Sequence, residues 1–333
     1  MRIWFNRGFS LAPIAAAMRE SEPGLAVFVS VGEHQPQREG PTATWIEPEG
    51  SDTDYITWVR DMVSANRIDV LIPTRRRSLI ATADLECGVE LPASSEILDL
   101  LDDKYAFAAC LEGEPYHLST RLISSTEDLA RTIATFARDY PDDAPPCVKP
   151  RRGVNGHGFW RLMRDRPMSH LDNPDNRKIL DRLYVAAAEA AEEAGNFQDL
   201  VLMEYLPGPE ISLDMLAHEG ALLKIAARTK LPNGVQRIQT EHCLTPVARD
   251  LVSRFGLHGV VNAQFRRAAD NSWKLLEINT RPAGGIVYSE HVGCGLLADW
   301  AALLMGRKHS AQVSAACIDT HIRLTTTITQ IAA

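Results

Sequence analysis

Hydrophobic and polar positions alternate in a regular order over residues 1–95. Apolar runs at residues 1–5, 25–31 and 68–73 are separated by helical patterns at residues 10–20 and 52–66. This order predicts a βαβαβ unit, which is a small parallel sheet covered by helices. No G-x-G-x-x-G follows the first run, so this unit is not expected to be the main nucleotide site. A helical pattern over residues 95–110 ends the unit.

The rest of the chain divides into two further segments. Residues 118–205 predict a strand at 118–124, a helix at 125–140, a strand at 146–150 and a long helix at 175–194. Residues 206–333 are dominated by antiparallel strand pairs, with a closing helix near 296–305. The predicted fold class is therefore α/β followed by α+β.

Charge and hydropathy exclude two classes of partner. The chain has 35 Lys and Arg against 43 Asp and Glu, a formal charge of −8, so it lacks the basic field that binds nucleic acid. It also lacks the run of ~20 apolar residues needed to cross a bilayer. We therefore expect a cytoplasmic protein with no nucleic-acid or membrane partner.

Residues 148–160, VKPRRGVNGHGFW, combine a lysine with glycines. An apolar strand delivers Lys149 and gives way to Gly153, Gly156 and Gly158. Glycines let backbone N–H groups approach an anion, and a lysine ammonium supplies a point charge for phosphate. The segment is not a P-loop, because the closing G-K-S/T is absent. It indicates a flap over phosphates; an ordinary glycine-rich hairpin with an exposed lysine is the alternative.

Residues 200–230 predict a hairpin with a polar face. Side chains alternate along a strand, so Glu210, Ser212 and Asp214 lie on one side of the first strand. The turn-like residues 218–220 end this strand. Folding the hairpin there would set Glu210 opposite Arg228 and Asp214 opposite Lys224. These charges predict contacts to a ribose and phosphates, or else form a solvated sheet face. The candidate residues for nucleotide contacts on this hairpin are Glu210, Asp214, Arg228 and Lys230.

Residues 256–285 predict a second hairpin, with a polar turn near residues 269–272. Reflecting the chain about this turn brings Gln264 close to Glu277, and Asn279 follows on the same face. Carboxylate and amide oxygens suit magnesium, which keeps several waters and shares nucleotide phosphates. Arg281 follows, directly before Pro-Ala-Gly-Gly, where its planar guanidinium group could bind a carboxylate or phosphoryl group. A buried acid at Glu277 paired with Arg281 is the alternative.

In this order the segments resemble the ATP-grasp superfamily, in its carboxylate–amine ligase and carbamoyl-phosphate-synthetase-like branch. The resemblance rests on DDKYAF with Lys104, VKP with Lys149, MEYLPGPE with Glu204, and LLEINTRPAGG. It implies a small parallel, Rossmann-like pre-ATP-grasp domain at residues 1–95 and a helical linker at 96–117. A two-lobed ATP-grasp fold with antiparallel sheets would follow. Its small lobe, with a glycine-rich phosphate loop, would span 118–205, and its large lobe, with the metal and catalytic residues, 206–333.

The resemblance also implies residue roles. Lys104 and Lys149 would contact ATP phosphates or adenine, and Lys149 would share the catalytic role with Arg281, which would meet the acyl phosphate. Glu204, with the backbone of Tyr205 and Leu206, would face the adenine and its ribose. The implied metal ligands are Glu277, Asn279 and Gln264. Many members have a carboxylate where this chain has the neutral Gln264, which weakens charge compensation for two tightly held ions.

The implied activity is an ATP-dependent ligase. It would convert a carboxylate into an acyl phosphate with release of ADP and couple it to an amine, with amino acids or small peptides as substrates. Mg²⁺ would be the metal, with Mn²⁺ as a substitute, and a homodimer is expected only because dimers are common. Two alternatives stay open, namely a phosphotransferase that stops at a phosphorylated product and an ATP-binding regulator without chemistry.

Two weaker signals remain. The sequence PTRRR, residues 73–77, follows an apolar strand at its carboxyl end, where ligands of open α/β sheets bind, so an acidic substrate could dock there. A solvated helix start is the alternative. His291 could touch the acceptor or act as a base, or it could be a hydrogen-bonded structural histidine.

Overall fold

The computed structural model describes residues 1–8, 10–35, 38–139, 145–153, 156–165, 167–315 and 317–325. Contacts within the chain define two compact units. Unit 1 comprises Met1–Leu98, Ile211–Gln264 and Ile278–Ala333, and unit 2 comprises Asp99–Glu210 and Phe265–Glu277. The domain boundaries expected from the sequence remain predictions.

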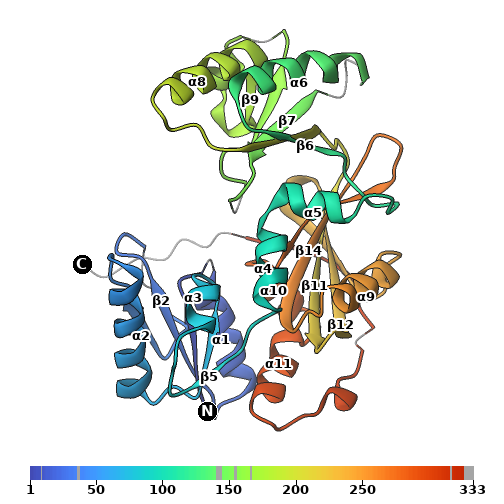
Figure 1. The fold of residues 1–333 in the computed structure, drawn as a ribbon. Coiled ribbons are helices and arrows are strands. Elements are labelled where there is room, and N and C mark those ends of the chain that lie inside the picture. Colours follow the sequence, from blue (N-terminus) through green and yellow to red (C-terminus); the bar gives the residue numbers. More distant parts are fainter. Residues whose placement is uncertain are drawn as a thin grey trace, which may run out of the picture. The chain divides into compact units, whose positions relative to one another are not determined.

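Unit 1 begins with a five-stranded parallel sheet, drawn in blue to cyan in Figure 1. The order is β3-β2-β1-β4-β5, from β1 (Arg2–Asn6), β2 (Ala26–Val31), β3 (Ala43–Ile46), β4 (Val70–Pro73) and β5 (Gly88–Val89). Its helices are α1 (Leu11–Ser21), α2 (Asp52–Asn66) and α3 (Arg77–Ala81). The predicted βαβαβ core is confirmed. The sequence missed β3, β5 and α3, which are too short to show a hydrophobic period.

Side chains of β1 alternate between the two faces of this sheet, and each face is covered by a different helix. Ile3 and Phe5 pack with the buried stripe of α1, whereas Trp4 packs with Tyr55 and Val59 of α2. Helix α2 starts where predicted because Ser51 and Asp54 form a reciprocal capping box.

Unit 2 contains a mixed sheet in the order β6-β10-β7-β8-β9. The strands are β6 (Thr120–Ile123), β7 (Pro146–Pro150), β8 (Trp160–Met163), β9 (Lys178–Leu180) and β10 (Leu200–Glu204). Only the β8–β9 pair in this sheet is parallel among the pairings described. The helices near it are α5 (Lys104–Cys110), α6 (Thr126–Asp139), α7 (Ser169–Asp172) and α8 (Asp181–Glu193), with a 3-10 turn at Pro174–Asn176.

Two helix predictions need correction. The pattern at residues 95–110 is two helices, α4 (Ser95–Asp102) and α5, because Asp103 has an extended backbone and caps α5. The long helix predicted at 175–194 begins only at Asp181, after a 3-10 turn and β9. The predicted helix at 125–140 is observed as Thr126–Asp139, and Tyr140 lies outside the described residues.

A six-stranded sheet follows in the order β15-β14-β11-β12-β13-β16. Its strands are β11 (Glu210–His218), β12 (Ala221–Lys230), β13 (Val235–Gln239), β14 (Gly259–Arg267), β15 (Trp273–Asn279) and β16 (Asp319–Arg323). The helices are α9 (Thr245–Arg254), α10 (Ile286–His291) and α11 (Leu296–Leu304), with short 3-10 turns at Pro232–Gly234 and Ser310–Gln312. The predicted antiparallel pairs and closing helix are confirmed.

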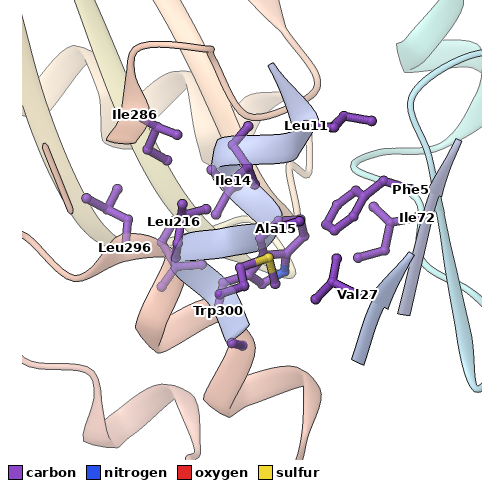
Figure 2. Packing of buried hydrophobic residues seen from close by; sticks show 14 of the residues in the cluster. Phe5, Leu11, Ile14, Ala15, Val27, Ile72, Leu216, Ile286, Leu296 and Trp300 are labelled. Atoms are coloured by element: carbon purple, nitrogen blue, oxygen red, sulfur yellow. The ribbon is translucent and has the colours of Figure 1, made fainter. Parts of the chain in front are cut away.

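One hydrophobic core joins the two sheets inside unit 1. Figure 2 shows α1 between the parallel sheet and the later elements, with Ile14 and Ala15 between Phe5 on one side and Leu216 and Trp300 on the other. All five side chains are almost fully buried. Burying an aliphatic or aromatic side chain of this size stabilises a fold by ~1.5–3 kcal/mol. The parallel sheet and the core of the large antiparallel sheet therefore belong to one unit.

No described helix has both the length and the apolar character that a bilayer-spanning helix requires.

Candidate active site

Lys104 is held in place by the residue before it. The Asp103 carboxylate caps α5 by accepting the N–H groups of Tyr105 and Ala106, each at 3.1 Å. It also accepts the Arg151 guanidinium, with Nε at 2.9 Å and Nη2 at 2.7 Å. The Lys104 N–H donates to the Arg151 carbonyl at 3.1 Å. The start of α5 is thereby fixed to the end of β7.

Asp103 remains a carboxylate despite its burial. Burial alone would raise its pKa, but the hydrogen bond from Arg151 and the backbone N–H of Ala106 outweigh that effect and hold the pKa below its usual value. Arg151 extends the network, since its Nη1 lies 3.0 Å from Asp199. The charge that positions Lys104 is therefore present throughout the neutral range.

Two other predicted residues interact electrostatically with Lys104 in unit 2. Burial and the positive charge of Lys149 lower the pKa of Lys104 to about 8, and the negative charge of Glu277 opposes this shift. Lys149 lies on β7, and Glu277 lies on β15. Residues separated by more than a hundred positions in the sequence thus form one electrostatic group with two cations and one acid.

An apolar recess lies beside this group. The two lysines and Thr120 are its polar members, and its other lining residues are Phe107, Ala108, Leu111, Leu118, Met203, Leu275 and Leu276. All of them belong to unit 2. Pockets for cofactors commonly pair an apolar lining with a few placed polar groups. The recess is narrow, and both lysines are only partly buried.

The glycine-rich loop after β7 adopts backbone angles that favour glycine. Gly156 and Gly158 have φ values of 64° and 68°, in the left-handed region. A Cβ on Gly158 would also lie 2.8 Å from the ring of Pro150. The carbonyl of Gly153 accepts a hydrogen bond from the Lys104 ammonium at 2.7 Å. The loop and the first lysine are therefore in direct contact, while residues 154–155 lie outside the described part of the chain.

The segment Glu204–Leu206 follows β10 in the same unit. Glu204 is half-buried, and burial raises its pKa, which the charge of Asp270 raises further and that of Lys274 lowers. The Leu206 side chain is buried. The N–H of Tyr205 already donates to the Pro145 carbonyl at 3.3 Å. Of the two predicted backbone contributors, Tyr205 would therefore offer its carbonyl.

Sequence reasoning missed two arginines around Tyr205. The Arg161 guanidinium carbon lies 3.6 Å from the centre of the Tyr205 ring, and that of Arg266 lies 5.1 Å from it. Arg266 also donates to the Tyr205 hydroxyl at 3.1 Å and to the Gly208 carbonyl at 3.0 Å. No sequence signal predicts this stack, because the arginines belong to β8 and β14. Both contacts fix the segment that follows Glu204.

The hairpin register predicted for residues 200–230 is wrong. Arg228 pairs with Ser212 rather than Glu210, and Lys224 pairs with Leu216 rather than Asp214. The turn contains two residues, Glu219 and Gly220, both with positive φ, which shifts the register by one position. A β-bulge between Leu216 and Ala217 shifts it by a second.

Asp214 and Arg228 form a buried ion pair in unit 1. Their exposed fractions are 0% and 3%, so the solvated face considered for this hairpin is wrong at these positions. Arg228 Nε lies 2.5 Å from one Asp214 oxygen, and Nη2 lies 3.2 Å from the other. The carboxylate also accepts Asn262 at 2.8 Å and Ser289 at 3.3 Å. Asp214 is therefore saturated with donors from the chain and orients Arg228.

The loop that carries Arg281 packs on this ion pair. A Cβ added to Gly285 would lie 2.3 Å from Nη1 of Arg228, and one added to Gly284 would lie 2.5 Å from the hydroxyl of Ser10. Arg281 itself is half-buried, and its Nη1 lies 3.4 Å from the Pro282 carbonyl. The two glycines thus let the loop approach Arg228 and Ser10 closely.

The predicted metal ligands lie on two neighbouring strands. Gln264 is on β14, and Glu277 and Asn279 are on β15, two residues apart and so on one side of the strand. All three are half-buried. The described residues contain no group of three His, Cys, Asp or Glu side chains suited to a metal ion. Glu277 belongs to unit 2, whereas Gln264 and Asn279 belong to unit 1. The two remaining candidates are Glu210, half-buried at the start of β11, and Lys230, exposed at the end of β12.

Solved structures with the same fold place the chain in a known structural class. It superposes on a biotin carboxylase–β,γ-ATP complex from Campylobacter jejuni with a TM-score of 0.67 and 16% identity, covering 96% of this chain and 74% of that one. The superposition on an L-amino acid ligase from Bacillus licheniformis has a TM-score of 0.64 and 14% identity, and it covers 94% of this chain and 77% of that one. A third match is the biotin carboxylase domain of a Hydrogenobacter thermophilus 2-oxoglutarate carboxylase, solved with MgADP, ADP and bicarbonate. Its TM-score is 0.64 with 15% identity, covering 92% of this chain and 69% of that one.

The chain has the ATP-grasp fold. Residues 196–327 match a family model described as "ATP-grasp in the biosynthetic pathway with Ter operon". The resemblance to the ATP-grasp superfamily and the fold class predicted from the sequence are thus confirmed. No curated protein sequence matches the chain significantly.

Proposed function

We propose that this protein is an ATP-dependent ligase that activates a carboxylate as an acyl phosphate and couples it to an amine. The observation that carries the proposal is the group formed by Lys104, Lys149 and Glu277 beside an apolar recess. In a chain with the ATP-grasp fold, this arrangement suits a nucleotide with an apolar base and a charged phosphate tail. Glu204 and the Tyr205 carbonyl, next along β10, would contact the base and ribose.

The two lysines would neutralise the phosphates. Lys149 lies on the rigid strand β7, and Lys104 is fixed through Asp103 and Arg151, so neither needs a large rearrangement to meet the nucleotide. Preorganised cations are most effective where charge develops in the transition state. Their mutual repulsion, which lowers the pKa of Lys104, is relieved when an anion binds between them.

Magnesium suits the carboxylate of Glu277 on β15, which would supply a charged ligand. Asn279 and Gln264 remain predicted amide-oxygen ligands. With a single carboxylate, the ion would depend on phosphate oxygens and water for its remaining positions. When bound, the metal would offset the negative charge of the transferring phosphoryl group. The solved MgADP complex of the H. thermophilus carboxylase domain supports this choice of metal and nucleotide.

The proposed reaction has two steps. A carboxylate oxygen of the substrate attacks the γ-phosphorus of ATP, the bond to the β-phosphate oxygen breaks, and ADP leaves. The amine nitrogen then attacks the acyl carbon, the bond to the phosphate oxygen breaks, and phosphate and a proton leave. Arg281, on a loop held against Arg228 and Ser10, would orient the carboxylate and stabilise the acyl phosphate.

Amino acids or small peptides are the proposed substrates. Structural similarity to the L-amino acid ligase supports this substrate class, and the biosynthetic pathway in the family description agrees with an amide-forming reaction. We also propose a homodimer, because the H. thermophilus carboxylase domain is described as a dimer.

The test is to incubate the purified chain with Mg-ATP and pooled carboxylates and amines. We expect ADP release only when both an acid and an amine are present, with an amide detected by mass spectrometry. Arg281→Ala should bind ATP normally but lose turnover by ~10²–10³-fold. Arg249→Ala, an exposed arginine on α9, is the matched control.

Three results would contradict the proposal. Phosphate retained on a single acceptor would indicate a phosphotransferase. ATP binding without ADP release in any pool would indicate a regulator. Unchanged turnover in Arg281→Ala would remove the role given to that residue.

A further inference from the structure

The turn after β4 carries three consecutive arginines on a fixed backbone. Asn6, at the end of the neighbouring strand β1, is fully buried, and both the oxygen and the nitrogen of its side-chain amide bind the turn. Its oxygen accepts the N–H groups of Thr74 at 2.6 Å and Arg75 at 3.1 Å. Its nitrogen donates to the Arg75 carbonyl at 2.7 Å and to the Tyr55 hydroxyl at 3.0 Å. The arginines therefore start from a preorganised scaffold.

The first two arginines differ in their surroundings. Arg76 is engaged within unit 1, because its guanidinium carbon lies 4.3 Å from the centre of the Tyr55 ring and its Nη1 lies 3.4 Å from Asp52. Arg75 is exposed. Its charge helps to stabilise the carboxylate of Glu47, but that acid is buried and hydrogen-bonded to Ser30. Arg75 therefore presents its positive charge to solvent at the carboxyl edge of the sheet.

Arg77 links this edge to the proposed catalytic loop. Its guanidinium donates to the hydroxyl of Thr280, the residue directly before Arg281. Arg281 follows Thr280 in the chain, and consecutive Cα atoms are ~3.8 Å apart, so the Arg77 guanidinium lies close to the backbone of Arg281. Thr74, Thr280 and Arg281 line one small recess in unit 1, whose lining also includes Glu90 and His258 but not Arg75 or Arg77. The turn after β4 and the loop that carries Arg281, about two hundred residues apart in the sequence, are thus in direct contact.

We propose that the carboxylate substrate carries a second anionic group, which Arg75 and Arg77 bind while the reacting carboxylate lies at Arg281. The placement of the reacting carboxylate at Arg281 rests on the proposed ligase function. Guanidinium groups bind carboxylate and phosphate through paired hydrogen bonds, so the second group is a carboxylate or a phosphate. Because Arg77 contacts the residue next to Arg281, we expect a compact dianion, with only a few carbon atoms between its charges.

Binding of matched probes tests the proposal without turnover. We would titrate the full chain with butyrate, succinate and 3-phosphonopropionate by calorimetry in the absence of ATP. Hydrogen bonds to charged groups contribute ~1.5–3 kcal/mol, so at least one dianion should bind ~10–100-fold more tightly than butyrate. Preference for succinate would identify a carboxylate as the second group, and preference for the phosphonate would identify a phosphate.

Variants separate recognition from folding. Arg77→Ala should remove most of the dianion preference, and Arg75→Ala, an exposed position that should not disturb the fold, should reduce it several-fold. Arg60→Ala on α2, whose guanidinium binds the Asp84 carbonyl, is the control and should retain it. Thermal melting would verify that each variant is folded.

Equal binding of butyrate and both dianions would overturn the proposal, as would an unchanged preference in the Arg75→Ala/Arg77→Ala double variant. Either result leaves the ligase function standing if an acid and an amine still release ADP. Conversely, a clear dianion preference in a chain that never releases ADP would refute the ligase function alone.

Discussion

The pKa of Lys104 predicts how nucleotide affinity depends on pH. Burial and the charge of Lys149 lower this pKa to about 8, which leaves the ammonium partly deprotonated just above neutral pH. A phosphate binds the charged form, so deprotonation removes an interaction. Affinity for ADP should therefore be nearly constant below pH 7 and fall as the pH rises through 8.

The size of the effect follows from the fraction of charged Lys104. With a pKa of about 8, this fraction falls from ~0.9 at pH 7 to ~0.1 at pH 9, a tenfold change that corresponds to ~1.4 kcal/mol. An ordinary lysine with a pKa near 10.4 would lose only a few per cent of its charge over the same range. The two cases are therefore easily distinguished.

Calorimetric titration of Mg-ADP at half-unit steps from pH 7 to 9 would measure the effect. Lys104→Arg should flatten the curve, because arginine stays charged throughout this range. Lys178→Arg, a conservative change on β9 outside the recess lining, should keep the wild-type curve. An equally flat curve for the wild-type protein would refute the assignment of Lys104 to phosphate binding.

Two further predictions concern the loop that carries Arg281. Gly285→Ala should lower turnover at least tenfold, because the new Cβ would lie 2.3 Å from the buried Arg228 guanidinium; Gly88→Ala, with 3.5 Å to its nearest neighbour, should be silent in the same ADP-release assay. Asp214→Ala should destabilise the protein by ~3–5 kcal/mol in urea unfolding, since it removes the carboxylate that pairs with the buried Arg228 guanidinium. Adding Arg228→Met should recover part of that loss, and an unchanged urea midpoint in the single variant would contradict the account.

The longer elements were predictable because their hydrophobic patterns are local. The α2 bounds follow from Ser51 and Asp54 at its start, and β1, β2 and β4 follow from apolar runs of four or more residues. The break at Asp103 was missed although Asp is a preferred N-cap residue and accepts the nearby N–H groups of Tyr105 and Ala106. Its second partner, Arg151, lies almost fifty residues away. Local periodicity contains no information about such a contact.

The roles of the candidate site residues remain predictions, and their geometry was only partly readable from the sequence. The charges of Lys149 and Glu277 both act on Lys104. The hairpin register failed because alternation does not reveal a bulge at Leu216. No sequence pattern singled out Asn6, although its amide binds Thr74 and Arg75 in the turn after β4.

A common arrangement underlies the cations of both units. Asp103 fixes Arg151 beside Lys104, Asp214 fixes Arg228 beneath the Gly285 loop, and the Asn6 amide fixes the turn that carries Arg75. In each case a buried polar group holds a backbone segment or a guanidinium in place through hydrogen bonds within the chain. Anionic substrates require several cations at close range, and like charges repel, as the lowered pKa of Lys104 shows. The buried partners counter this repulsion by fixing the backbone or guanidinium from which each charge projects. Replacing one of them should therefore weaken ligand binding even where the cation itself is retained.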